Sequence, residues 1–213
     1  MENSLYFHTR LLIAIFMMTL SICSAYAADD KAYEIGESLQ KEKVVKEPLN
    51  VSYKNLDWEA LSPADWDPLE ALKGLDLDKL DDADPKAIEA LIAVGEAWKN
   101  APVNPALSGQ RVRMSGFVVP LDISKVKVKE FLLVPYFGAC IHVPPPPSNQ
   151  AVHAVNTQVD NKQQNEHLKN AALIQGPITI IGTLETISSD TSMGSAGYIV
   201  QIESIEEYKE TIN

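Results

Sequence analysis

Alternating polar and apolar residues in the second half of the chain predict five β-strands. The clearest alternation runs over Gln110–Leu121, where Gly116 is the expected site of a bend or bulge. The other strands are expected at 130–136, 151–160, 177–185 and 197–205. A Ser/Gly-rich loop over 188–196 joins the last two strands as a long hairpin, and the polar residues 161–175 predict a loop or a short helix. We therefore expect a small OB-like five-stranded β-barrel over residues 101–213.

Residues 55–100 carry helical signals instead. The clearest helix is predicted over 84–98, with Asp84 as the N-cap and Pro85 as the first helical residue. The apolar positions of this helix mark one face, namely Ile88, Leu91, Ile92 and Gly95, extended by Trp98. The predicted fold class is therefore α+β, an OB-like barrel preceded by an N-terminal helical segment.

The N-terminus has the pattern of a secretory signal peptide over residues 1–27. An apolar run over Leu11–Leu20 leads to the small-residue cleavage site Ala25–Ala27. This run is shorter than the about 20 apolar residues of a membrane span. Lipidation at Cys23 is the alternative, but Ile22 is larger than the small residue expected before a lipidated cysteine. We expect cleavage after Ala27 and a periplasmic protein.

Composition and charge narrow the possible functions. The polar residues 28–54 predict a flexible arm after the signal peptide. A net charge of −11 disfavours binding to nucleic acids and to anionic lipid surfaces. Once Cys23 leaves with the signal peptide, Cys140 is the one cysteine left, so no internal disulfide is expected.

The candidate chemistry lies in the motif Ala-Cys-Ile-His-Val-Pro-Pro-Pro-Pro-Ser at 139–148. Four consecutive prolines form a stiff extended segment, and in an extended strand Cys140 and His142 point to the same face. A turn after the prolines could bring His153 beside them, and Asp122 at the end of the first strand could approach the same end of the barrel. These residues would form a Cys/His/His or Cys/His/Asp site for zinc, with copper as the alternative.

Other interpretations of the same residues stay open. Cys140 can be a buried structural residue, or a thiol nucleophile for which His153 would be a better base than His142. No nucleophile motif flanks the cysteine, so an enzyme is not the favoured reading. The proline segment can be a ligand for an aromatic groove or a rigid wall, and the amides of Asn149 and Gln150 can lock its carbonyl groups.

The motif resembles the signature of an uncharacterised family of bacterial exported proteins and lipoproteins. The resemblance covers about 55–205 and is carried by Val-Val-Pro-Leu-Asp at 118–122, Phe-Leu-Leu-Val-Pro at 131–135, and Cys-x-His-x-Pro-Pro-Pro-Pro-x-Asn-Gln at 140–150. The family has a domain of unknown function and no established activity, so the resemblance supplies no catalytic residues. Some relatives occur beside genes for ABC-type exporters and in metal-regulated clusters, which implies a periplasmic accessory role in metal handling.

The sequence thus favours a periplasmic accessory protein that binds a transition metal, zinc first, through Cys140, His142, His153 and Asp122, and that assists an ABC-type envelope transporter. The alternative is a metal-free interaction module that docks on a membrane-protein partner through the proline segment and the barrel face. Nothing in the sequence indicates a small-molecule substrate, and the oligomeric state is left open.

Overall fold

A computed structural model describes residues 32–39, 52–74, 81, 84–122, 128–157, 161–174 and 176–209. The chain divides into two compact units, Met1–Tyr33 and Glu34–Asn213, and the architecture below is that of the second. The expected signal peptide, its cleavage site and Cys23 lie outside the described residues.

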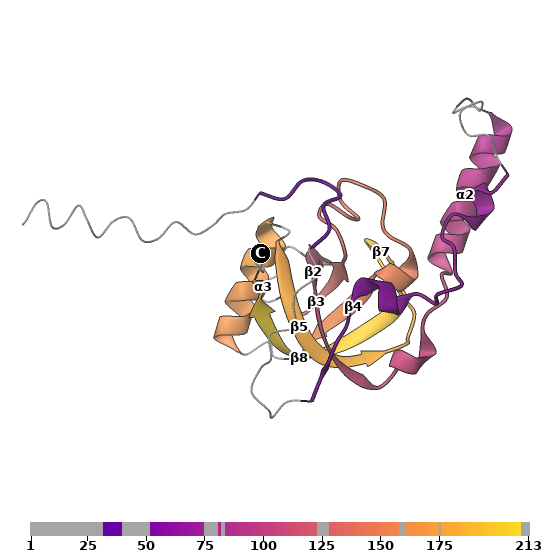
Figure 1. The fold of residues 1–213 in the computed structure, drawn as a ribbon. Helices are drawn as coiled ribbons and strands as arrows, with labels where there is room; N and C mark the ends of the chain where they lie inside the picture. Colours follow the sequence, from indigo (N-terminus) through magenta and orange to yellow (C-terminus); the bar gives the residue numbers. More distant parts are fainter. Residues whose placement is uncertain are drawn as a thin grey trace, which may run out of the picture. The chain divides into compact units, whose positions relative to one another are not determined.

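Five strands close into a mixed barrel, which confirms the predicted small α+β barrel (Figure 1). These strands are β2 (Gln110–Pro120), β3 (Glu130–Val134), β4 (Val152–Asn156), β5 (Pro177–Glu185) and β8 (Tyr198–Glu207). They follow the order β2-β3-β4-β8-β5, and β5 pairs back onto β2. β4 and β8 run parallel, whereas the other barrel neighbours are antiparallel. This order and this single parallel pair are those of an OB-fold.

Strand β2 has one buried and one exposed face, as the alternation in its sequence predicted. Its inward residues Val112 and Met114 are buried, while Arg111 and Arg113 point outward and form ion pairs with glutamates of β8. β2 pairs with β5 up to Phe117 and with β3 from there on. Gly116 lies at this change of partner, and a Cβ atom there would come within 2.7 Å of the Leu133 side chain. The glycine is therefore required by close packing.

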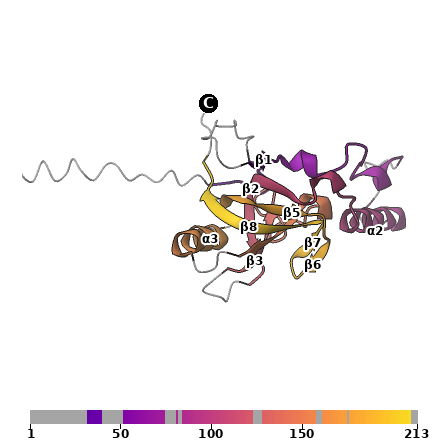
Figure 2. The ribbon, with the colours of Figure 1, turned by 90° about the horizontal axis from the view of Figure 1, so that it is seen from below.

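Helix α3 (Lys162–Ile174) connects β4 to β5 and covers the barrel with Leu168 and Ala171, both buried in the core. It occupies the polar segment for which the sequence predicted a loop or a short helix. Helix α2 (Pro85–Lys99) begins as predicted, since the Asp84 side chain accepts a 2.8 Å hydrogen bond from the Lys86 amide. Figure 2 shows α2 and α3 on opposite sides of the barrel strands. Within the described ranges, no helix has the length and apolar character needed to cross a membrane.

Short elements complete the domain. The predicted loop between the last two strands contains a small hairpin that the sequence did not predict, β6 (Ser189–Thr191) and β7 (Gly194–Ala196). Short 3-10 helices are η1 (Trp58–Leu61), η2 (Glu70–Leu72), η4 (Pro105–Leu107) and η5 (Ser148–Gln150).

Two short pieces of the predicted N-terminal arm, residues 36–38 and Lys54, pair with the barrel domain. β1 (Lys54–Asn55) runs parallel to β2. Farther upstream, the Gly36 amide donates to the Phe137 oxygen at 2.9 Å, and the Phe137 amide donates to the Glu37 oxygen at 3.0 Å. Residues 34–37 thus form a turn against the segment that follows β3, and Ser38 makes an isolated antiparallel bridge with Tyr136.

The two ends of the helical segment contact the same residue of the barrel. The Tyr198 hydroxyl donates a 2.5 Å hydrogen bond to the Leu61 oxygen and accepts one of 2.6 Å from the Asn104 amide. Tyr198 is fully buried, so one side chain of β8 holds both ends of the stretch that contains α2.

Candidate functional site

The Cys140 motif forms a tight turn, and the extended strand assumed from the sequence is wrong. The backbone N–H groups of residues 141–143 all point to the Gly138 oxygen, at 2.8 to 3.3 Å. A bridge between Ala139 and Val143 closes the turn. Gly138 and Cys140 both have left-handed backbones, with φ of 82° and 65°. The same-face argument for a cysteine and a histidine two residues apart therefore does not apply here.

The thiol in this turn is protonated at neutral pH. Cys140 is partly buried, and this burial raises its pKa from 9.0 to about 11. The pKa of Tyr136 is also raised, first by burial and then by the nearby Cys140. An activated cysteine nucleophile has a lowered pKa, so the turn lacks the electrostatics of a thiol enzyme. His142 is exposed on the surface of the turn.

The structure places the other two predicted ligands away from this turn. Asp122 follows Pro120, which pairs with Phe131 at the start of β3, whereas Cys140 comes after the end of that strand. In the part of the chain that the structure describes, Asp122 does not form a group of three possible metal ligands with Cys140 and His142.

His153 lies on β4 and is bound by neighbours that the sequence did not indicate. Its Nδ1 is 3.1 Å from the Ser189 hydroxyl of β6, and its Nε2 is 3.4 Å from a carboxylate oxygen of Glu130. Across the described ranges, no three His, Cys, Asp or Glu side chains are grouped closely enough to hold a metal ion. The imidazole of His153 links the β6–β7 hairpin to the barrel.

The two amides that end the motif are structural clamps. Asn149 Nδ2 donates to the Pro102 oxygen at 2.9 Å, and Gln150 Nε2 donates to the Trp58 oxygen at 3.0 Å. Gln150 also donates to the Ser62 hydroxyl at 2.9 Å. We expected these amides to bind carbonyl groups of the proline segment, but they fix the chain before and after α2 to the barrel.

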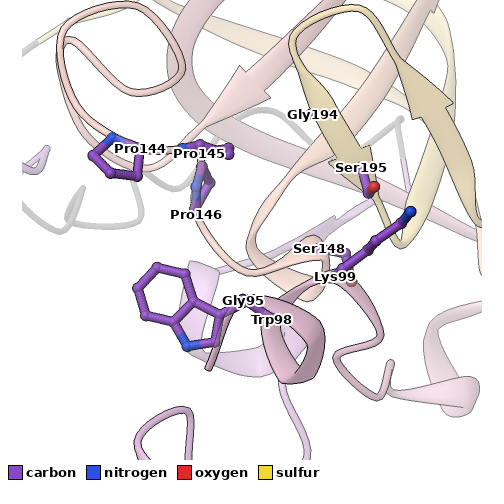
Figure 3. Close-up of a pocket in the computed structure, with 9 residues that line it drawn as sticks. All are labelled: Gly95, Trp98, Lys99, Pro144, Pro145, Pro146, Ser148, Gly194 and Ser195. Carbon is purple, nitrogen blue, oxygen red and sulfur yellow. The ribbon is translucent and has the colours of Figure 1, made fainter. Parts of the chain in front are cut away.

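The proline segment forms one wall of a pocket of about 300 Å³. The opposite wall comes from the C-terminal half of α2, and the third side from the tip of the β6–β7 hairpin (Figure 3). The lining is mostly apolar, with Lys99 as its one charged side chain. The lining residues are Gly95, Trp98, Lys99, Pro144, Pro145, Pro146, Ser148, Gly194 and Ser195. The prolines thus act as the rigid wall that the sequence suggested.

Helix α2 presents its largest aliphatic side chains to solvent. Ile88, Leu91 and Ile92 are 46%, 65% and 62% exposed, while the smaller Ala90 and Val94 are buried. The helix is as predicted, but its bulkiest apolar face is not the face that packs. We call Ile88, Leu91 and Ile92 the α2 apolar face.

Comparisons with known proteins place the chain in a family. The model of the family described as "Protein of unknown function (DUF3299)" matches residues 58–207. The crystal structure of a DUF3299 family protein from Pseudomonas aeruginosa PAO1 is 33% identical, with a TM-score of 0.52, and the match covers 76% of this chain and 100% of that one.

Other comparisons add nothing about function. A structure described as an aspartyl-tRNA synthetase from Leishmania major Friedlin has a TM-score of 0.27 and 15% identity, over 51% of this chain and 20% of that one, too weak a likeness for argument. The comparison with curated proteins gives no match. The family match covers most of the barrel domain and α2, and we conclude that the chain belongs to the DUF3299 family of proteins of unknown function.

Proposed function

We propose that this protein is an exported interaction module of the cell envelope, which docks on a partner protein through the α2 apolar face and the adjoining proline segment. The observation that carries the proposal is the exposure of Ile88, Leu91 and Ile92 on one helix. Soluble monomers seldom expose contiguous groups of large aliphatic side chains, and such groups mark binding surfaces.

The energetics favour a partner over simple exposure to water. Full burial of an Ile or Leu side chain is worth about 1.5–3 kcal/mol, and these residues are 46–65% exposed, so covering the face supplies about half of that value for each. The helix can present this face because its capped N-terminus and its buried Ala90 and Val94 hold it without using the larger side chains. The amide clamps fix the chain at both ends of the segment, which limits the conformational entropy lost on binding.

The metal-binding hypothesis competes with this proposal at a different place. Cys140 and His142 share one turn, but a site there would need further donors from outside the described residues. Zinc analysis of untagged protein separates the two functions. If the protein is an interaction module, Cys140→Ser should not remove any stoichiometric zinc. Stoichiometric zinc lost in that variant would favour the metal role.

Site-specific photocrosslinking in intact cells tests the docking surface. A photoreactive residue at Leu91 should give a discrete adduct with another envelope protein. The matched control is Ala93, which is exposed on the opposite side of the same helix and should give none. The change Ile92→Glu should lower the Leu91 adduct at least about tenfold. Absence of an adduct at Leu91, or equal adducts at both positions, would overturn the proposal.

A further inference from the structure

The pocket beside α2 continues the α2 apolar face. Ile88, Ile92, Gly95 and Lys99 are spaced by four, three and four residues, so they follow one line along the helix. Gly95 and Lys99 line the pocket. A peptide that covers the apolar face and runs toward the C-terminus of α2 therefore reaches the pocket.

The apolar walls are fixed before any ligand arrives. Trp98 Nε1 donates a 2.7 Å hydrogen bond to the Pro68 oxygen, which holds the indole in one orientation. Pro145 lies so close to Gly194 that a Cβ atom there would be 3.1 Å from the proline ring. Proline and tryptophan rings make these walls apolar, so they suit an apolar side chain. Because prolines have little side-chain freedom to lose, binding against them costs little conformational entropy.

Two polar side chains of the pocket, Lys99 and Ser195, offer different contacts to a ligand. Lys99 is exposed, and it makes no ion pair with any residue in the described part of the chain. Figure 3 shows its side chain extending toward Ser195. The Ser195 hydroxyl donates a 2.6 Å hydrogen bond to Asp190, so its oxygen is left to accept a hydrogen bond. The pocket thus offers a cation for a carboxylate and an acceptor for an N–H group.

We infer that the pocket binds the carboxy-terminal residue of the partner protein, an apolar residue whose carboxylate pairs with Lys99 and whose amide donates to Ser195. This inference rests on the proposed function and names the part of the partner that is recognised. Because the Ser195 hydroxyl hydrogen is donated to Asp190, the Ser195 oxygen accepts from the ligand amide, and the carboxylate pairs with the Lys99 ammonium.

Two small probes test the inference on the mature protein. N-acetyl-L-phenylalanine carries an apolar side chain, an amide N–H and a carboxylate, and its carboxamide differs only in the charge. Binding is followed by NMR through the indole N–H signal of Trp98. We expect the acid to bind about fivefold more tightly than the carboxamide, equal to about 1 kcal/mol.

Matched variants assign the preference to one side chain. Lys99→Met should remove the preference for the acid. Lys86→Met, on the same helix but outside the pocket, should retain it. Equal binding of the two probes to the wild type, or no shift of the Trp98 signal, would overturn the inference.

The crosslinking assay separates this inference from the proposed function. The Leu91 adduct should weaken in Lys99→Met and persist in Lys86→Met. An adduct of unchanged yield in Lys99→Met overturns carboxylate recognition and leaves the docking surface standing. Absence of the Leu91 adduct from the wild type would overturn both the proposed docking function and the inference that rests on it.

Discussion

The side-chain amide of Asn149 donates a 2.9 Å hydrogen bond to the backbone oxygen of Pro102, and so ties the end of the proline segment to the residues that follow α2. Asn149 is completely buried, although its residue type usually lies at the surface. We predict that Asn149→Ala lowers the free energy of unfolding by about 1–2 kcal/mol, because it removes this bond and leaves a small cavity.

Urea denaturation measures this loss. Asn170→Ala is the control, because Asn170 is exposed on α3 and its replacement should change the free energy of unfolding by less than about 0.5 kcal/mol. Equal effects of the two substitutions would show that the amide of Asn149 is not a clamp.

Two glycines should respond in opposite directions to alanine. A Cβ atom at Gly182 would lie 2.3 Å from the Gln201 oxygen, next to the irregular register of β5 and β8. Gly182→Ala should therefore lower the free energy of unfolding by about 1–3 kcal/mol. A Cβ atom at Gly95 meets nothing within 4 Å. Gly95→Ala in α2 should therefore raise the free energy of unfolding by about 0.5–1 kcal/mol. Thermal unfolding of both variants checks the predicted signs.

The reactivity of Cys140 should follow its raised pKa. Because burial raises the thiol pKa from 9.0 to about 11, alkylation of the folded protein by iodoacetamide should have its midpoint near pH 11. In urea the midpoint should fall to about pH 9, the ordinary value. A midpoint below pH 9 in the folded protein would contradict the structure of the turn.

The same pKa shift predicts a change of stability with pH. The unfolded state releases the thiol proton at a lower pH than the folded state, so the unfolded state is stabilised relative to the folded state as the pH rises through 9. The contribution of the Cys140 thiol to the free energy of unfolding is therefore fully present below pH 9 and is lost progressively as the pH rises through about 11. The difference between the unfolding curves of wild type and Cys140→Ser measures this effect together with the part of the Tyr136 pKa shift that Cys140 causes.

The arm beside Phe137 can be tested by hydrogen exchange. The Phe137 amide donates to the Glu37 oxygen, so a chain that begins at residue 40 loses this acceptor. We expect the Phe137 amide to exchange at least about tenfold faster in the shortened chain. Amides of β3, which are paired within the barrel, should keep their rates. Unchanged exchange at Phe137 would mean that the arm is not held in solution.

The sequence predicted the barrel well because its signals are local. The alternation in β2 records one buried and one exposed face, and β5 (Pro177–Glu185) has the predicted bounds. The start of α2 was predicted because Asp84 and Pro85 form a local capping signal. These patterns depend on neighbours a few residues away, which the sequence displays directly.

The surface chemistry could not be predicted in the same way. Hydrophobicity marked the face of α2 with Ile88, Leu91 and Ile92, but the choice of packed face depends on which segments surround the helix. The left-handed backbone of Cys140 turned a predicted strand into a turn. The pocket joins residues near 95–99, 144–148 and 194–195, which only the tertiary fold brings together.

Both ends of the helical excursion meet at the hydroxyl of Tyr198, through Leu61 and Asn104. A stretch whose two ends are neighbours can be exchanged for a short turn without changing the path of the barrel strands. The barrel can therefore carry helices of other sequence between residues 62 and 103.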